Sequence, residues 1–164
     1  MEIIIDGYNL IGSTYGLGAD LEHRRNWLVQ RLSLYQEMRG HRIIVVFDGW
    51  NSGSIREMSE QPKQGLRVVF SRHGEKADSV VVRLARENGS GSVVVSSDRE
   101  VRRAVAKFGA AAIYADEFGE ILRNLELISE FGEYQRVPRS SKQGNPNRLS
   151  KVARKRLEKL KKLR

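Results

Sequence analysis

Five short apolar runs alternate along the chain with segments of helical periodicity. Each run is continuous rather than alternating, which is typical of strands covered on both faces of a sheet. The pattern predicts an α/β fold, a three-layer sandwich in which helices cover a central, mostly parallel five-stranded sheet. The predicted strands span Glu2–Asp6, Arg42–Asp48, Leu66–Ser71, Ser92–Ser97 and Ala110–Tyr114.

The segments between these runs have apolar residues at three- and four-residue spacing, as expected for helices packed on a sheet. The glycines that follow the first three segments, Gly40, Gly89 and Gly109, predict the ends of helices. Residues 49–65 are polar and predict a long loop, for which a lid over the site and a plain connector both fit. The predicted helices span Asp20–Arg39, Lys76–Asn88, Asp98–Phe108 and Glu117–Phe131.

The C-terminal part of the chain differs in composition from the rest. Residues 1–133 form the predicted domain, 134–148 have the composition of a linker, and 149–164 predict a basic amphipathic helix. Its apolar stripe fits docking on the protein's own body, on a partner or on a membrane surface, and the pattern leaves these open. The stripe consists of Leu149, Val152, Ala153, Leu157, Leu160 and Leu163.

Composition excludes several classes of site. The 164 residues suit one domain. The chain has no cysteine, so disulfides and thiolate metal sites are excluded, and its three histidines lack metal-ligand spacing. No apolar run approaches the roughly 18–20 residues of a membrane span, and the N-terminus lacks the pattern of a signal peptide. A cytoplasmic location is therefore expected.

The net charge of +9 is concentrated at the C-terminal end. Residues 134–164 hold 12 Lys and Arg and one acidic residue, a net charge of +11, so residues 1–133 hold 17 basic and 19 acidic residues. A nearly neutral domain with a strongly basic extension favours a polyanionic partner, with RNA or the ribosome first, although a solvated tail is an ordinary alternative.

Four aspartates belong to one end of the predicted sheet. Asp6 and Asp48 end the first two strands, Asp98 follows the fourth, and Asp78 opens the helix after the third. In an open parallel sheet these ends form one edge, where ligands bind. Each aspartate also has an ordinary explanation, since the first two precede glycine as in turns and the others suit the start of a helix. Four carboxylates together would repel one another without a cation, and oxygen ligands suit Mg²⁺ or Mn²⁺. With a polyanionic partner, one or two such ions indicate phosphodiester hydrolysis.

Four motifs at these positions resemble one family. "IIIDGYNLIG", "VVFDG", "KADSVVVRLA" and "VVVSSDREV", in this order, are similar to the NYN-domain ribonucleases, and most to their YacP-like branch. The resemblance covers roughly residues 1–133, and the branch tends to have a basic C-terminal extension. It implies a PIN-like fold and a divalent-metal-dependent endoribonuclease, in which the metal activates a water that attacks the RNA phosphodiester.

The resemblance also implies the roles of single residues. Asp6, Asp48, Asp78 and Asp98 would be catalytic, and Asp6, Asp78 and Asp98 would be the metal ligands. Asn9 would shape the site, although a turn contact with its own backbone is an equal alternative. Some relatives have a second acid directly after the third aspartate. This chain has serine there, which puts the binding of a second ion in doubt.

Further residues flank the predicted site. Ser97 and Glu100 fit a capping box, so Ser97 is expected to cap a helix, although Ser96 and Ser97 also suit contacts to a phosphate or a bound water. Basic residues near the aspartates and in the tail are expected to contact RNA phosphates, with solvated surface charge as the alternative. These basic residues are Lys76, Arg99, Lys151, Arg154, Lys155 and Lys159.

Other functions fit parts of the pattern. A non-catalytic RNA- or ribosome-binding module on the same fold is the main alternative to the ribonuclease. DNA cleavage fits the chemistry, but flap-type DNA nucleases usually have longer chains. A phosphatase of the haloacid dehalogenase type needs aspartate two residues after Asp6, where this chain has Tyr8.

Overall fold

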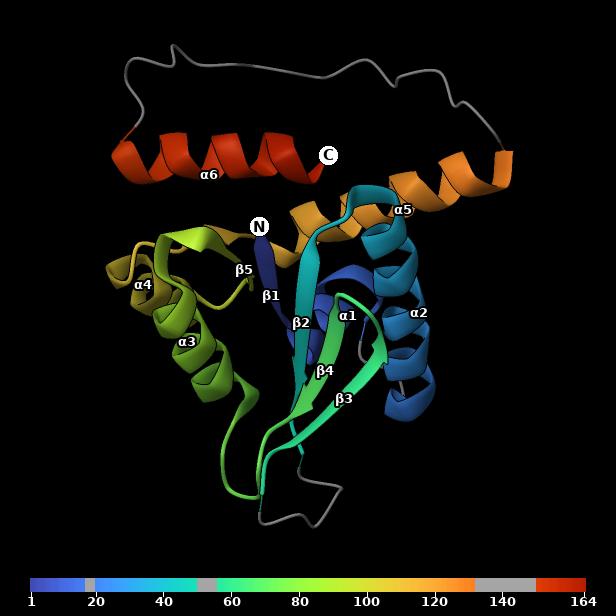
Figure 1. Cartoon of the computed structure of the whole chain (residues 1–164), viewed down its shortest axis with the longest axis horizontal. Coiled ribbons are helices and arrows are strands. Elements are labelled where there is room, and N and C mark those ends of the chain that lie inside the picture. The colour runs from blue at the N-terminus through green and yellow to red at the C-terminus, as the bar shows by residue number, and fades with distance from the viewer. Residues whose placement is uncertain (17–19, 50–55, 132–149) are drawn as a thin grey trace.

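The computed structural model describes residues 1–16, 20–49, 56–131 and 150–164 and shows a sheet between two layers of helices (Figure 1). The strand order is β3-β4-β2-β1-β5-β6, and only β3 runs antiparallel to its neighbour. The strands are β1 Glu2–Asp6, β2 Arg42–Phe47, β3 Met58–Lys63, β4 Leu66–Phe70, β5 Ser92–Val95 and β6 Ala111–Ile113. The helices are α1 Gly7–Tyr15, α2 Leu21–Arg39, α3 Ala77–Asn88, α4 Arg99–Lys107, α5 Ala115–Phe131 and α6 Lys151–Leu163, with a 3₁₀ turn at Gly89–Gly91.

The predicted three-layer α/β fold is confirmed, with six described strands rather than five. The additional strand, β3, lies within residues 49–65, which the polar sequence predicted as a loop. It contains Pro62, is almost entirely exposed, and pairs with β4 at the edge of the sheet, with an irregular register between Glu60 and Lys63. Backbone pairing rather than burial forms this strand, so a search for apolar runs does not find it.

The core consists of two apolar clusters, one on each face of the sheet. In β1 the side chains alternate between them, since Ile3 and Ile5 belong to one cluster and Ile4 to the other, all fully buried. Residues of α1, α2, α5 and α6 complete the first cluster, and residues of α3 and α4 complete the second. Coverage on both faces explains why the parallel strands are continuous apolar runs.

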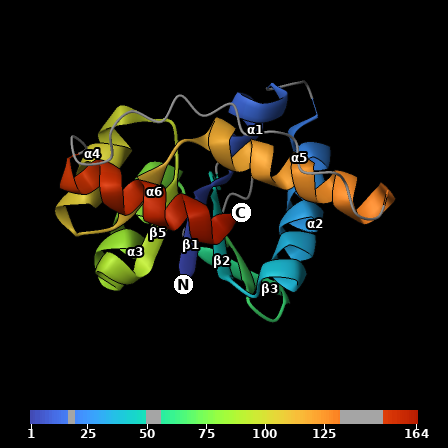
Figure 2. The same ribbon diagram turned by 90° about the horizontal axis from the view of Figure 1, so that it is seen from above.

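Helix α6 docks on the protein's own body, one of the three alternatives that the sequence left open. Leu160 and Leu163 are buried in the first core cluster, and the hydroxyl of Tyr35 donates to the backbone carbonyl of Leu163 over 3.1 Å. Lys155 donates to the carbonyl of Gly109. The helix crosses the amino ends of the strands (Figure 2). The predicted linker, residues 134–148, lies outside the described residues. None of the described helices has the length and hydropathy of a membrane-spanning segment.

The docking of α6 makes a prediction about stability. Leu163 is fully buried and Leu157, on the same helix, is 39% exposed. Replacing Leu163 by Ala is expected to lower the free energy of unfolding by about 2–5 kcal/mol because it leaves a cavity in the core. Leu157→Ala is expected to change it by less than about 0.5 kcal/mol. Urea unfolding measures both, and equally small losses would contradict the docking.

Candidate active site

Asp6 lies at the centre of the strand ends. It is the last residue of β1, which pairs with β2 on one side and β5 on the other, so the strand order reverses at this position. Its carboxylate accepts a hydrogen bond from the backbone N–H of Asn9 over 3.1 Å and caps α1. The Asp6–Gly7 pair is therefore the start of a helix, and its interpretation as a turn is wrong. A Cβ on Gly7 would lie 2.2 Å from the ring of Phe47, so only glycine fits.

The carboxyl group of Asp6 is in an unusual electrostatic state. The residue is 7% exposed, and its pKa is raised from 3.8 to about 7, mainly by burial and against the opposing effect of the hydrogen bond from Asn9. Hydrogen bonding with the side chain of Asp78 and the charges of Asp78 and Asp48 contribute to the same increase. Asp78 is thus within hydrogen-bonding reach of Asp6, with Asp48 within electrostatic reach. A cation placed here would relieve the repulsion among the three groups.

Asp48 joins the end of β2 to the start of α3. Its Oδ1 accepts a hydrogen bond from the backbone N–H of Ala77 over 2.7 Å, although the two residues are 29 positions apart. Asp78, the next residue, lies in the first turn of α3, where the helix dipole favours negative charge. This one hydrogen bond therefore holds Asp48 and Asp78 close to each other, where the end of β2 meets the start of α3.

Asp98 is used differently from the other three aspartates. It caps α4, because its Oδ1 accepts from the backbone N–H groups of Glu100 at 2.6 Å and Val101 at 3.0 Å. The prediction that Ser97 caps this helix is wrong. The hydroxyl of Ser97 instead accepts from the N–H of Ala115 over 3.1 Å, at the start of α5. A capping aspartate satisfies two N–H groups here, so the Ser97–Glu100 spacing is not a capping box.

Asn9 connects two strand ends. Its Oδ1 accepts a hydrogen bond from the backbone N–H of Ser97 over 2.8 Å, across 88 positions of sequence. The alternative of a turn contact between this side chain and its own backbone is wrong. The bond holds the corner after β5 beside the start of α1, on the side of Asp6 away from Asp48. This is a positioning role, and a role in the chemistry stays a prediction.

The site offers a hard divalent ion two neighbouring carboxyl groups rather than three. In residues 1–16, 20–49, 56–131 and 150–164, no three acidic or histidine side chains converge closely enough to hold one metal ion. Mg²⁺ is commonly held by only one or two carboxylates, with waters and substrate phosphates completing its shell. Asp6 and Asp78 fit that arrangement, and Asp48 lies within electrostatic reach of Asp6. The metal-ligand role of Asp6, Asp78 and Asp98 stays a prediction.

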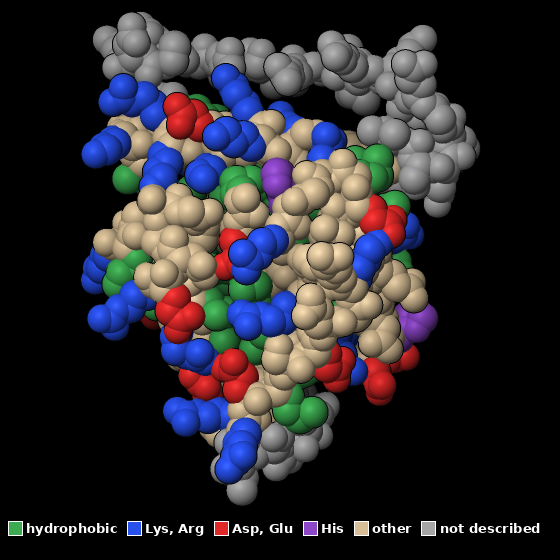
Figure 3. All heavy atoms as spheres, in the orientation of Figure 1, with side chains coloured by type: hydrophobic (Ala, Val, Ile, Leu, Met, Phe, Trp, Pro, Cys, Tyr) green, Lys and Arg blue, Asp and Glu red, His purple; other side chains and the backbone are tan. Residues whose placement is uncertain are grey.

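The predicted RNA-binding residues fall into two groups. Lys76 and Arg99 are exposed at the starts of α3 and α4, on the edge of the sheet that holds the aspartates. The other four lie on α6, at the opposite ends of the strands, where Lys and Arg side chains gather on the surface (Figure 3). Lys151 and Arg154 are exposed there. Lys155 helps to dock the helix, and burial together with Lys162 and Lys155 lowers the pKa of Lys159.

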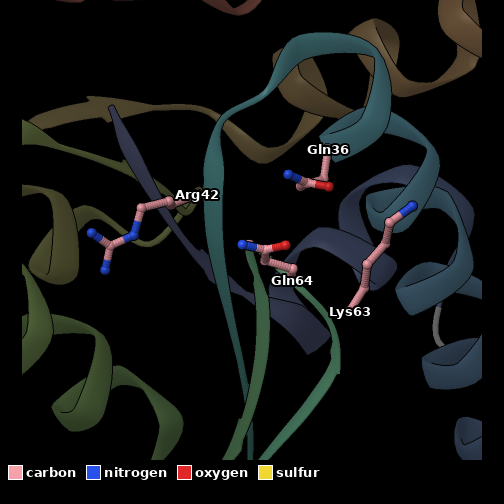
Figure 4. Close-up of a pocket in the computed structure, with 5 residues that line it drawn as sticks. Gln36, Arg42, Lys63 and Gln64 are labelled. Atoms are coloured by element: carbon pink, nitrogen blue, oxygen red, sulfur yellow. The ribbon is translucent and has the colours of Figure 1, made fainter.

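A pocket of about 520 Å³ lies away from the aspartates (Figure 4). Gln36, Arg42, Lys63, Gln64 and Gly65 line it, at the amino end of β2 and the turn between β3 and β4. Both of its basic side chains form ion pairs with glutamates outside the lining, Glu2 and Glu37. It has neither a carboxyl pair nor a nucleophile and is not the candidate active site.

Comparison with known proteins assigns the chain to a family. The family model described as the YacP-like NYN domain matches residues 3–164. This chain belongs to that family. The curated "Uncharacterized protein YacP" of Bacillus subtilis (strain 168) is 29% identical over 131 residues, which cover 77% of this chain and 75% of that protein. The match of the family model extends through α6, so the basic helix belongs to the family region.

Solved structures of this NYN family agree with the fold. The crystal structure of Rae1 (YacP) from Bacillus subtilis matches with a TM-score of 0.64 and 28% identity, over 79% of this chain and 78% of that one. A mutant of the same protein matches with a TM-score of 0.62 and 26% identity, over 80% and 86%. The three-layer architecture is therefore shared with this YacP-like relative.

Ser71, which holds the backbone next to Asp48, was not predicted from the sequence as a residue of the site. Its hydroxyl accepts a hydrogen bond from the backbone N–H of Gly49 over 3.1 Å, directly after Asp48. The signal was a polar residue at the end of the apolar run "LRVVFS", where a serine that is 1% exposed needs a partner.

The state of Asp6 predicts how stability depends on pH in metal-free protein. The folded pKa of about 7 lies above the ordinary 3.8, so between these values the folded state retains a proton that the unfolded state has lost. Stability should therefore fall as pH rises through this window, by up to about 3 kcal/mol between pH 5 and pH 8. Asp6→Asn keeps a capping oxygen and should remove most of this loss.

Urea unfolding in chelator at the two pH values measures the effect. Asp20→Asn is the matched control, because Asp20 caps α2 through the N–H of His23 but is exposed. Wild type and the Asp20 variant should share one pH dependence. If Asp6→Asn shows the same pH dependence of stability as the wild type, the Asp6 carboxyl group does not have a raised pKa in the folded protein.

Proposed function

We propose that this protein is a divalent-metal-dependent endoribonuclease. The observation that supports it most is the buried Asp6 carboxyl group, within hydrogen-bonding reach of Asp78 and electrostatic reach of Asp48, at the point where the strand order reverses. A buried carboxyl group held close to a second, half-buried one has a cost in the free protein, which a bound cation would relieve. Membership of the YacP-like NYN family supports RNA as the substrate, since the chemistry alone does not distinguish RNA from DNA.

Each side chain has a proposed part in the reaction. Asp6 and Asp78 would hold Mg²⁺ or Mn²⁺, which when bound would neutralise phosphate charge and lower the pKa of a water. Asp48 accepts from Ala77 through one oxygen, which leaves the other oxygen to orient the attacking water. That water attacks phosphorus opposite the 3′ oxygen, so the products have a 5′-phosphate and a 3′-hydroxyl.

The remaining residues position this chemistry. Asn9 holds the β5 corner in place through the Ser97 N–H. Lys76 and Arg99, exposed beside the aspartates, would attract the RNA backbone. Asp98 would be a third metal ligand only if its carboxylate binds the metal and keeps the cap of α4 at the same time.

A second candidate function is an RNA- or ribosome-binding module without catalysis. The observation that favours it is the basic outer surface of α6, which is remote from the aspartates and would bind a polyanion without them (Figure 3). Its exposed basic residues are Lys151, Arg154, Lys161, Lys162 and Arg164. In the nuclease proposal the same surface would hold a distant part of a large RNA, such as a ribosomal one.

Cleavage of 5′-labelled single-stranded and structured RNAs, with matched DNAs, tests the proposal. With Mg²⁺ or Mn²⁺ the wild type should cut internally, and chelator should abolish cutting. Asp6→Asn and Asp78→Asn should lower the rate by at least about 100-fold, because each removes a ligand or a charge from the site. Asp98→Asn keeps an oxygen for the helix cap, so its effect reports on the loss of the negative charge rather than on the loss of the cap.

Glu158→Gln is the control, because it removes an exposed carboxylate on α6, far from the site. Cuts that persist in Asp6→Asn and Asp78→Asn would exclude this site. Tight, salt-sensitive RNA binding without cleavage, on free RNA and on translating ribosomes, would favour the binding module.

A further inference from the structure

We infer that the β4–α3 loop, Ser71–Lys76, grips phosphates next to the scissile bond, through Arg72 and Lys76. The inference rests on the proposed function and names a binding surface for it. In sequence, this loop links the carboxyl end of β4 to the helix of Asp78. It therefore borders the aspartates on the side of β2 and β4.

Hydrogen bonds anchor both ends of the loop to the corner that holds Asp48. At one end the N–H of Ser71 donates to the carbonyl of Phe47 over 2.9 Å, and its hydroxyl accepts from Gly49 over 3.1 Å. At the other end the N–H of Ala77 donates to Asp48 over 2.7 Å. The loop thus has a fixed position relative to the aspartates.

The middle of the loop is a closed turn. The N–H of Glu75 donates to the carbonyl of Arg72 over 3.0 Å, and Gly74 has φ of 81°, a conformation that suits glycine. The turn exposes Arg72, His73 and Lys76 to solvent. A rigid loop pays little additional conformational entropy when it binds a ligand.

Arg72 is oriented but remains available. Its Nε lies 3.3 Å from Oε2 of Glu75. The side chain of Glu75 is only 18% exposed, and its Oε1 lies 4.0 Å from a terminal nitrogen of Arg83. The Arg72 side chain is 63% exposed. The ion pair uses Nε, and the two terminal nitrogens of a guanidinium have four further N–H donors, in the geometry that binds phosphate oxygens in pairs.

A groove of about 330 Å³ begins at this loop. Arg56, Glu57, Arg72, Glu75 and Arg83 line it, so it has three guanidinium groups against two carboxylates. With Lys76 at the start of α3, this side of the site has the positive charge that the aspartates lack. RNA phosphates approaching those aspartates meet repulsion, and the loop and groove offset it for the flanking phosphates.

The test measures three loop variants, Arg72→Ala, Lys76→Ala and the two changes combined, and compares each with Arg67→Ala. Arg67 is an exposed arginine near the opposite end of β4 and is the matched control. KM for single-stranded RNA should rise about 5- to 10-fold for each single change, because a charged contact is lost, with kcat within about 2-fold of wild type. Arg72→Lys should restore part of the loss, because it keeps the charge but not the paired donors.

RNA binding in chelator, measured by fluorescence anisotropy across salt concentrations, gives a second readout. The slope of log Kd against log salt should decrease by about one for each phosphate contact removed. Thermal melts of every variant establish that the fold is intact. Slopes and KM equal to those of Arg67→Ala would overturn the inference, and so would a fall in kcat at unchanged KM.

The two proposals fail separately. A wild type that does not cleave any RNA overturns the nuclease, while the salt slopes in chelator still test the loop. A wild type that cleaves RNA, with loop variants indistinguishable from the control, overturns the inference and leaves the nuclease in place.

Discussion

The burial of the Asp6 carboxyl group, at the end of a strand whose centre is three buried isoleucines, is the constraint on which the site depends. β1 is the strand at which the order of the sheet reverses, so the corners after its two neighbours flank this residue. Asp48 and Asp78 come close to it because a single hydrogen bond, from Ala77 to Asp48, holds the start of α3 at the end of β2. The fold thus assembles carboxyl groups that would otherwise separate.

The pattern of apolar residues predicted the fold but not its finer hydrogen bonding. Continuous apolar runs locate β1, β2, β4, β5 and β6 because burial on both faces forms them, whereas β3 forms by pairing at an exposed edge. α1 was missed, because Asp6–Gly7 has the composition of a turn. The bond from Ser97 to Asn9 spans 88 positions, and no local spacing encodes it.

The two ends of the sheet have different charge and chemistry. The aspartates lie at the carboxyl ends of the strands, and α6, with its basic outer face, crosses their amino ends (Figures 1 and 2). Docking uses the apolar side of α6, through Leu160 and Leu163, which leaves charged residues outward. An RNA that contacts both the aspartates and the basic face of α6 must therefore extend well beyond the segment that is cut.

The most direct test of the central claim, that Asp6 and Asp78 form a cation site, is a Mn²⁺ titration of the RNA-free protein followed by electron paramagnetic resonance. The wild type should bind Mn²⁺ saturably, Asp6→Asn and Asp78→Asn should each abolish this binding, and Glu158→Gln should leave it unchanged. Binding of equal affinity in all four proteins, or no binding to the wild type at millimolar Mn²⁺, would contradict it.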